Sequence, residues 1–316
     1  MAVYVNTNYS ALQGQRYLGN VQNQLTTTYQ RLSSGMRINS AKDDAAGLQI
    51  ADRLTSQING LNQGNRNASD GIALAQTMEA GMDEISGMLQ KVRTLAVQAN
   101  NGTNTSDDRR AIGKEMEALV NEVNRIAQKT TFAGKTILNG QIAGSIFGDP
   151  ANAGKAPAGD AGTLTLQVGS NKGDTISFTS NSVMFSKIGS GDLMGDAADK
   201  VFKTSADGTI TVTLTKAKTD TSSTSIAEIV NLMDSMISKV DGARADLGAL
   251  QNRLESSIRN QSNVAANEAD ARSRIRDADF AEESANLSQQ SIIQQAAASM
   301  LMQANTRPQL GLSLLG

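Results

Sequence analysis

Two long stretches of the chain, one toward each end, carry apolar residues at alternating steps of three and four positions. Such spacing gathers apolar side chains along one side of a helix, which is typical of a coiled-coil seam. A helix of this kind hides its seam against another helix, so the chain is predicted to fold mainly as paired helices. The most regular stretch runs without a slip through Ile226, Ile229, Met233, Met236, Val240, Ala243, Leu247, Leu250 and Leu254.

The N-terminal half predicts three successive helices. A seam over residues 18–32 is followed by a longer run over residues 48–99, whose rhythm slips near Met78. An Asn-Asn-Gly sequence at residues 100–102 breaks this run, and a third helix follows over residues 112–126. Three candidate N-cap residues precede that helix: Thr105, Ser106 and Asp107.

The order of predicted elements is nearly palindromic: short helix, joint, long helix, small β region, long helix, joint, short helix. Folding the chain back on itself lays its two ends side by side. A helix of about 50 residues spans roughly 75 Å at ~1.5 Å per residue. The predicted fold is therefore mainly α, an elongated antiparallel helical bundle or coiled coil built from the N- and C-terminal segments, with a small β-hairpin region in the middle.

The middle of the chain changes from helical spacing to strand and turn signals. Residues 163–178 read as two short strands around a Ser-Asn-Lys-Gly turn, and residues 208–215 read as another strand. Residues 141–163 are rich in Gly, Ala and Asp and are predicted to be loop. The Ser/Thr run from Thr219 to Ser225 is predicted to be a linker.

The segment RLSSGMRINSAKDDAAGLQIADRL, residues 31–54, reads as a helix end, a short connector and a helix start. Gly35 is a candidate C-cap, and Ser40 with Asp43 fits an acidic form of the capping box. A second break lies around residues 274–284, before a last helix predicted from about Phe280 to Ala304. Pro308 and Gly311 are predicted to end that helix.

Composition excludes several classes of function. The 316 residues include no Cys and no His, which removes disulfides, thiolate nucleophiles, the Ser-His-Asp triad, Cys metal sites and the commonest metal ligand. A net charge of −2 argues against nucleic-acid binding. The N-terminus, MAVYVNTNYS, lacks the basic and apolar regions of a secretory signal, and no stretch approaches the ~20 apolar residues of a membrane span. We expect a soluble protein that is cytosolic or exported without a cleaved signal.

The seams of the two terminal helices contain too few large apolar residues for these helices to fold stably by themselves. Ala11, Gly14 and Thr28 occupy seam positions near the N-terminus, and alanines and glutamines dilute the C-terminal face. Short helices with such faces are marginal alone, so residues 1–40 and 280–316 are expected to order only when other copies supply apolar surface. A head-to-tail contact that does not close a ring produces a helical filament. The predicted polymerisation seams consist of Leu18, Val21, Leu25, Leu32, Leu287, Ile292, Ile293, Met300 and Leu301.

Five ordered segments at the two ends resemble bacterial flagellin. They are NTNYSALQGQRYL, the segment 31–54 quoted above, LQKVRTLAVQANNGTN, TTFAGKTILNG, and the run from SRIRDADF to LGLSLL. The resemblance extends over roughly residues 1–140 and 225–316. The resemblance implies an extracellular filament protein, exported unfolded by a type III apparatus with an export chaperone. Its other implied partners are further copies of itself, the filament cap and the hook–filament junction proteins.

The resemblance also implies a division into domains. Residues 1–42 with 276–316 would form an inner terminal-helix domain, residues 43–189 with 221–275 an outer α-helical domain carrying the small β element, and residues 190–220 a short variable surface segment. The connector between the first two domains would be a spoke that includes Ser33, Ser34, Gly35, Asn39, Ser40 and Asp43.

Some flagellins are recognised by Toll-like receptor 5 through their second and third long helices. The matching positions are Leu89, Lys91, Leu95 and Glu115. Lys91 stands where recognised members often have Arg, and Lys lacks the planar fork of a guanidinium. The alternative is that Leu89 belongs to the core and the charges are solvated surface.

Four other interpretations stay open. An enzyme would need a carboxylate, Lys, Tyr or Ser mechanism, and no such constellation stands out, so we predict no catalytic activity and no cofactor. Asp43 and Asp44 could form a metal pair, but negative charge at a helix start explains them better. A hook–filament junction protein has similar end helices, and a generic coiled-coil scaffold would have ordered ends.

Overall fold

The fold is described by a computed structural model, which covers residues 7–142, 144–148, 161–189, 194–195, 201–204, 209–214 and 226–313. The chain divides into two compact units. The terminal unit consists of Met1–Asn59 with Asn263–Gly316, and the central unit consists of Gly60–Ser262. Helix α2 (Ala45–Ala99) and helix α5 (Ile226–Arg276) contribute residues to both units. The predicted domain boundaries at residues 42 and 276 stay a prediction.

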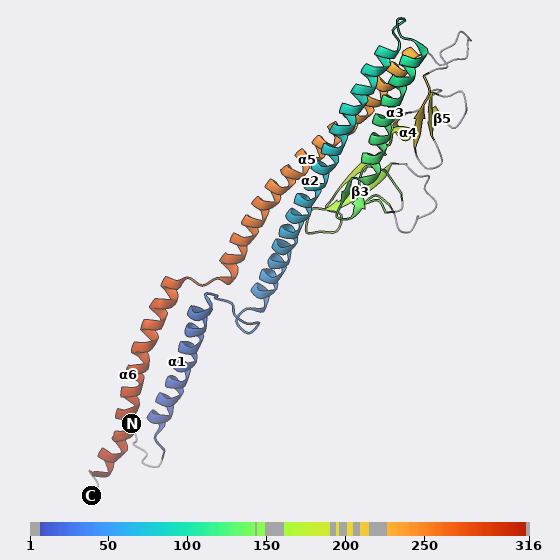
Figure 1. The fold of residues 1–316 in the computed structure, drawn as a ribbon. Helices are drawn as coiled ribbons and strands as arrows, with labels where there is room; N and C mark the ends of the chain where they lie inside the picture. Colours follow the sequence, from blue (N-terminus) through green and yellow to red (C-terminus); the bar gives the residue numbers. More distant parts are fainter. Residues whose placement is uncertain are drawn as a thin grey trace. The chain divides into compact units, whose positions relative to one another are not determined.

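The terminal unit is built around helix α1 (Tyr9–Ser34) and helix α6 (Phe280–Ser313), which lie side by side in opposite directions (Figure 1). Asn8 caps the start of α1, where its side-chain Oδ1 accepts a hydrogen bond from the backbone N–H of Ala11. Gly35 ends α1 in the left-handed conformation, with φ of 71°, as its predicted C-cap role requires.

The predicted end of the last helix is wrong. Helix α6 continues past Pro308 and Gly311 to Ser313. A proline inside a helix removes one backbone hydrogen bond and costs about 3 kcal/mol. The carbonyl that loses its partner is that of Ala304, and the side chain of Asn8 donates to it at 2.7 Å. A contact from the other end of the chain, which no local pattern reveals, thus compensates for part of the break.

The central unit has a three-helix core. Helix α3 (Ser106–Lys129) packs with α2 and α5 around buried side chains that follow the predicted spacing. Thr105 begins α3 with a full capping box, closed by Asp108. Polar pairs show that α2 and α5 run antiparallel: Arg93–Asp234, Asp83–Arg244 and Glu79–Gln251. Fully buried members of the core include Met78, Met82, Ile85, Leu89, Val92, Met116, Val123, Met233 and Met236.

Within the described residues, three small sheets join this helical core. The predicted hairpin is confirmed as strands β3 (Gly162–Gln167) and β4 (Thr175–Ser180), paired antiparallel with Leu164 opposite Phe178. A second hairpin joins β1 (Thr131–Phe132) and β2 (Lys135–Thr136). The third sheet has the order β5 (Met194–Gly195), β6 (Phe202–Thr204) and β7 (Ile210–Val212). A short helix, α4 (Phe185–Ile188), follows β4.

Side chains of α3 hold the third sheet and α4 in place. The amide of Asn121 pairs with both backbone groups of Ile210, donating to its carbonyl at 3.0 Å and accepting from its N–H at 2.8 Å. Asn124 accepts a hydrogen bond from the N–H of Phe185 at 3.0 Å. The predicted strand at 208–215 is confirmed over Ile210–Val212, while its two ends, most of the predicted loop at 141–163 and the Thr219–Ser225 linker lie outside the described residues.

Glycines let the β3–β4 hairpin approach α2. A Cβ atom added to Gly64 would lie 1.9 Å from the carbonyl oxygen of Val168, and one added to Gly60 would lie 2.6 Å from Cβ of Ser170. Real Cβ atoms do not come so near, so no larger residue fits without moving the hairpin. Asn67 adds a hydrogen bond from Nδ2 to the carbonyl of Gln167 at 2.9 Å.

Candidate functional site

The terminal helix pair, α1 with α6, is held together by few contacts. Arg31 and Glu283 form an ion pair at 3.0 Å, and the Glu283 side chain is largely buried. Thr28 donates to the side chain of Gln290 at 3.2 Å. Among the described side chains, the buried ones of this pair are only Val21, Leu25, Thr28, Glu283 and Ala297. A single chain therefore gives these helices a narrow seam with little apolar burial.

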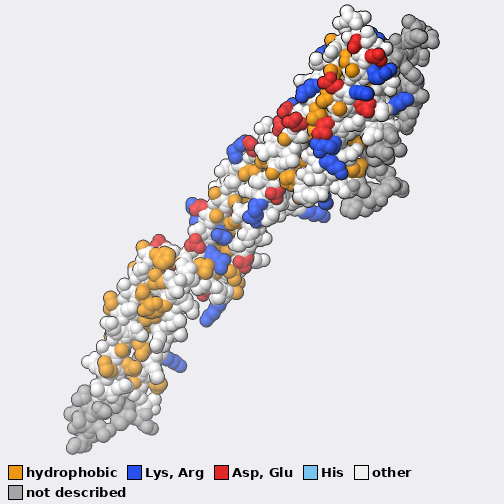
Figure 2. Space-filling view, viewed as in Figure 1, with side chains coloured by type: hydrophobic (Ala, Val, Ile, Leu, Met, Phe, Trp, Pro, Cys, Tyr) orange, Lys and Arg blue, Asp and Glu red, His pale blue; other side chains and the backbone are white. Residues whose placement is uncertain are grey.

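The outer surface of the same pair is unusually apolar. Among the described residues, eleven large apolar side chains are exposed, and eight of them lie on α1 or α6. Figure 2 shows such side chains gathered over this pair. The eight residues are Tyr9, Leu12, Tyr17, Tyr29, Phe280, Ile292, Met300 and Met302.

Charge is scarce on these helices. In 60 residues, α1 and α6 together carry five charged side chains. The 24 residues of α3, by comparison, carry ten. Interfaces that are fully buried avoid charge, because an unpaired charge taken out of water is costly. The terminal pair therefore has the composition of a surface that becomes covered. The five charged residues are Arg16, Arg31, Glu282, Glu283 and Arg307.

The predicted polymerisation seams divide into two groups in the structure. Val21 and Leu25 are buried between the two helices. A second group is half-buried and consists of Leu18, Leu32, Leu287, Ile293 and Leu301. Ile292 and Met300 are 67% and 70% exposed, so they make no part of the seam within one chain. Their role between chains stays a prediction.

The joint connects the two terminal helices to α2 and α5 and consists of residues 35–44 and 277–279. Its two connectors pair antiparallel through their backbones, with Met36 opposite Asp277. The side chain of Ile38, 2% exposed, fits over Gly47 at the start of α2, where an added Cβ would lie 2.7 Å from Ile38 Cδ1. The backbone hydrogen bonds run from Arg37 to Arg276 (2.7 Å), from Ile38 to Arg276 (3.3 Å) and from Ala278 to Gly35 (3.0 Å).

The predicted capping box at Ser40 is wrong, because α2 begins later, at Ala45. Asp44 is the capping side chain, with Oδ1 accepting from the N–H of Gly47 at 2.9 Å. Asp43 instead closes the turn before the helix. Its Oδ2 accepts from the N–H groups of Ser40 (2.9 Å) and Asn39 (3.1 Å), and these hydrogen bonds hold the pKa of Asp43 below its ordinary value.

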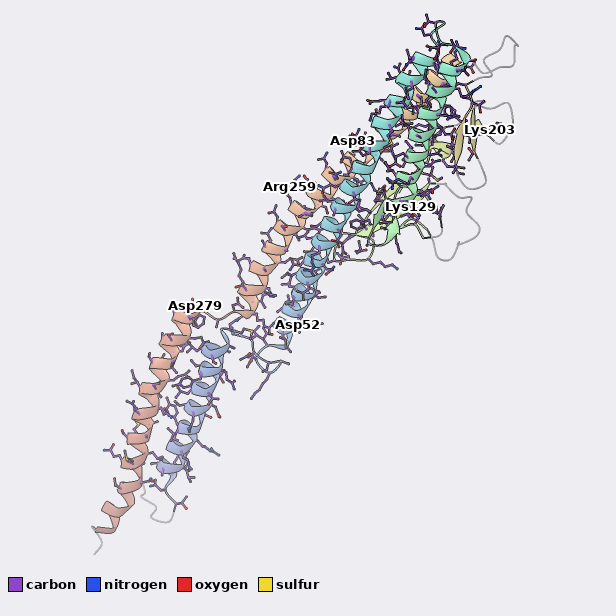
Figure 3. The ribbon with its side chains drawn as sticks, in the orientation of Figure 1. Asp52, Asp83, Lys129, Lys203, Arg259 and Asp279 are labelled. Carbon is purple, nitrogen blue, oxygen red and sulfur yellow. The ribbon has the colours of Figure 1, made fainter. Side chains whose placement is uncertain are left out.

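The other predicted spoke residues lie around this turn. Ser34 accepts hydrogen bonds from the side chain of Asn39 at 3.2 Å and from the N–H of Met36 at 3.2 Å. Ser33 and Ser34 are the last residues of α1 and are exposed. Asp279, at the matching break between α5 and α6, caps α6 by accepting from the N–H of Ala281 at 2.8 Å (Figure 3). Sequence analysis missed Asp279, although an Asp directly before a helix start is a capping signal.

The positions matched to receptor contacts differ in exposure. Leu89 is 0% exposed, in agreement with the alternative that it belongs to the core. Lys91 and Glu115 are exposed, and Leu95 is half-buried. Of the four, Lys91 and Glu115 are thus the side chains most available to a partner.

No helix in the described part of the chain combines the length and apolarity needed to cross a membrane. Within the same residues, no three His, Cys, Asp or Glu side chains are grouped so that they could hold a metal ion.

Comparison with known proteins gives consistent matches along the chain. Residues 5–143 match the bacterial flagellin N-terminal helical region, and residues 230–315 match the bacterial flagellin C-terminal helical region. Flagellin B of Vibrio cholerae serotype O1 is 36% identical over an alignment of 382 positions, gaps included, that covers 100% of both chains. Polar flagellin C of Vibrio parahaemolyticus serotype O3:K6 is 37% identical over 383, again covering 100% of both.

A solved structure assigned as a flagellar hook-associated protein from Vibrio parahaemolyticus has a TM-score of 0.55. It is 16% identical and covers 74% of this chain and 100% of its own. At that identity the likeness concerns the fold alone, so it does not favour the hook–filament junction interpretation over the full-length relatives. The two helical-region matches and those relatives agree, and the chain belongs to the bacterial flagellin family.

Proposed function

We propose that copies of this chain join through the terminal helix pair, whose apolar surface is completed only by neighbouring copies. Members of the bacterial flagellin family are structural subunits of the extracellular flagellar filament and not enzymes, so this chain is a filament subunit. The observation that carries the proposal is the concentration of exposed apolar side chains on α1 and α6. Exposed apolar patches of this extent mark protein interaction surfaces.

The arrangement of these side chains supports contact with more than one neighbour. Ile292 and Leu301 are nine residues apart, which at about 100° per residue places them on opposite sides of α6. Leu301 faces α1, where it approaches Gly14. Ile292 therefore faces away from α1, and a helix with apolar residues on several sides is stable when it is buried on several sides. This is the environment of a helix inside a tube of subunits.

Assembly would also stabilise the folded form of the terminal helices, which is marginal in a single chain. The narrow α1–α6 seam offers little burial to offset the entropy of folding two helices. We infer that these helices become fully ordered on joining the filament. Such ends suit export in an unfolded form through a type III apparatus with an export chaperone, followed by contact with the filament cap and the hook–filament junction proteins.

Recognition by Toll-like receptor 5 is a second proposal. It is supported by the exposure of Lys91 on α2 and of Glu115 on α3, with Leu95 partly accessible one turn beyond Lys91. A receptor reporter assay with purified monomer tests it, and Lys91→Glu should lower the signal while Lys135→Glu, an exposed position on β2, should not. No signal from the unmodified protein would exclude this proposal.

The assembly proposal is tested by truncation. Chains lacking residues 1–40, residues 280–316 or both are incubated with short filament seeds beside the full chain and inspected by electron microscopy. We expect the full chain to elongate the seeds and every truncated chain to fail, although residues 45–275 stay helical by circular dichroism. Elongation by the double truncation would contradict the proposal.

A further inference from the structure

The last turns of α6 contain a backbone defect. In a helix the carbonyl of residue 304 accepts a hydrogen bond from the N–H of residue 308. Residue 308 is proline, which has no N–H, and α6 nevertheless runs on to Ser313. The carbonyl of Ala304 is therefore left without its helical donor in a part-buried place.

The donor comes from the start of α1. Asn8 Nδ2 donates to the carbonyl oxygen of Ala304 at 2.7 Å. The other end of the same amide caps α1, because Asn8 Oδ1 accepts from the N–H of Ala11 at 3.1 Å. One side chain thus satisfies an unpaired N–H at the beginning of one helix and an unpaired carbonyl inside the other.

Neighbouring contacts bring the two helices close enough for this bond. Gly14 faces Leu301, and a Cβ atom added there would lie only 3.2 Å from Leu301 Cδ1. The contacts between the helices follow one antiparallel register, so that Asn8 reaches Ala304 when the rest of the pair is in place. In order from the joint, they are Arg31–Glu283, Thr28–Gln290, Gly14–Leu301 and Asn8–Ala304.

We infer that Asn8 is the residue that allows α6 to continue through Pro308, and that it couples the ordering of the first turn of α1 to that of residues 305–313. The inference rests on the proposed function in one respect: α6 belongs to the helix pair that the proposal assigns to contacts between copies. Without the Asn8 bond, helix α6 loses its continuity at Ala304, and the turns beyond it fray.

The substitution Asn8→Asp separates the two roles of the side chain. Aspartate caps a helix as well as asparagine does, and its charge is favourable at a helix start. It has no N–H to give to Ala304, because an ionised carboxylate only accepts. Pro308→Ala is the complementary change, since alanine supplies the N–H that makes the Asn8 donor unnecessary. Asn20→Asp, at an exposed position of α1, controls for the added charge.

The test is a double-mutant cycle on the full chain with Asn8→Asp, Pro308→Ala and both together. In seeded filaments we expect Asn8→Asp to speed amide hydrogen exchange over residues 305–313 by about tenfold, the loss of one hydrogen bond to a carbonyl. Asn8→Asp should also raise the critical concentration for elongation. In the Pro308→Ala background both effects should disappear, and Asn20→Asp should produce neither.

Other outcomes decide against the inference. It is overturned if Asn8→Asp has the same effect with Pro308 and with Ala at 308, or has no effect in either. If Asn8→Asp does not elongate seeds at all, recovery of elongation in the double variant supports the inference and continued failure overturns it. If even the unmodified chain does not elongate seeds, the proposed function fails together with its claim that α1 and α6 order only on assembly. The same exchange cycle on the free chain then decides the role of Asn8 separately.

Discussion

The central and terminal units use apolar residues in opposite ways. In the central unit, the apolar positions of α2, α3 and α5 point inward and form one buried cluster, while the surface is rich in charge. In the terminal unit, α1 and α6 bury a handful of side chains and leave eight large apolar ones exposed. The first unit satisfies its seams within one chain. The second presents an unfinished core and very little charge, which is what a repeating contact between copies requires.

Cavity-forming substitutions should show this contrast most strongly. Leu250→Ala, in the central core, should lower the free energy of unfolding of the free protein by about 3 kcal/mol. Leu25→Ala removes the same atoms from the α1–α6 seam, where little structure depends on them in the free chain, and should change that free energy by less than about 1 kcal/mol. Urea denaturation measures both. Equal losses would mean that the terminal pair is as integral to the free fold as the central core.

Glycine substitutions on α2 test how firmly the β3–β4 hairpin is docked within the central unit. Gly64→Ala should destabilise the free protein by about 2 kcal/mol, because its Cβ would overlap the carbonyl of Val168. Gly87→Ala, on the same helix with open space around it, should instead stabilise by about 1 kcal/mol. Thermal denaturation distinguishes the two signs, and stabilisation by Gly64→Ala would show that the hairpin is not held against α2.

Exposed apolar residues from the two units should behave differently in assembly. Ile292→Ser on α6 should raise the critical concentration for filament elongation about tenfold, the loss expected for one buried apolar side chain. Val97→Ser changes a residue that is also exposed, at 52%, but lies on α2 in the central unit, and should leave assembly unchanged. Neither should alter unfolding of the free protein. An equal effect of both on assembly would remove the distinction between the two surfaces.

The smallest expected effect concerns acid. Hydrogen bonds from the backbone of Ser40 and Asn39 keep the pKa of Asp43 below its ordinary value of 3.8. A carboxylate whose pKa is lowered by folding stabilises the turn when the pH is above its ordinary pKa. This stabilisation is lost as the pH falls through the lowered pKa. In the central unit, the Thr105 side chain and backbone lower the pKa of Asp108 in the same way. NMR titration should find both carboxyl groups below 3.8, and Asp43 at or above it would contradict the turn geometry.

Much of the helical architecture could be predicted from the spacing of apolar residues. The seam from Ile229 to Leu254 is buried where the pattern places it, except at the half-buried Ala243, and Ala99 ends α2 directly before the Asn-Asn-Gly break. Beyond Leu254 the same steps fall on Ser257, Gln261 and Val264, and Val264 is 37% exposed. Periodicity predicts these helices well because each long helix places apolar residues on the same face over many turns.

Features that depend on single contacts could not be predicted in the same way. The β1–β2 turn uses Ala133 and Gly134 with positive φ angles of 50° and 81°, and an alanine gives no signal for such a turn. The true cap of α2 is Asp44, because Asp43 is taken by the preceding turn. The pairing of Asn8 with Ala304 joins opposite ends of the chain, so it depends on a register that only the folded pair defines.

Within the candidate site, the sequence identified the right helices but not which side chains face inward. Val21 and Leu25 are buried in the chain, whereas Ile292 and Met300 are exposed. Where large apolar residues are sparse, alanine and glutamine can occupy the positions between the two helices as well as larger residues do. The spacing of apolar residues therefore does not identify which face of α1 or α6 is buried. Ala297, for example, is among the few buried residues of α6.

The central claim is that the terminal helices are incomplete until copies of the chain meet. Amide hydrogen exchange of the full-length protein, measured at high dilution and again in filaments, tests it most directly. We expect the amides of α1 and α6 to exchange rapidly in the free chain and slowly in filaments, while those of α3 and the central part of α5 are slow in both. Slow exchange throughout α1 and α6 in the dilute free chain would contradict the account.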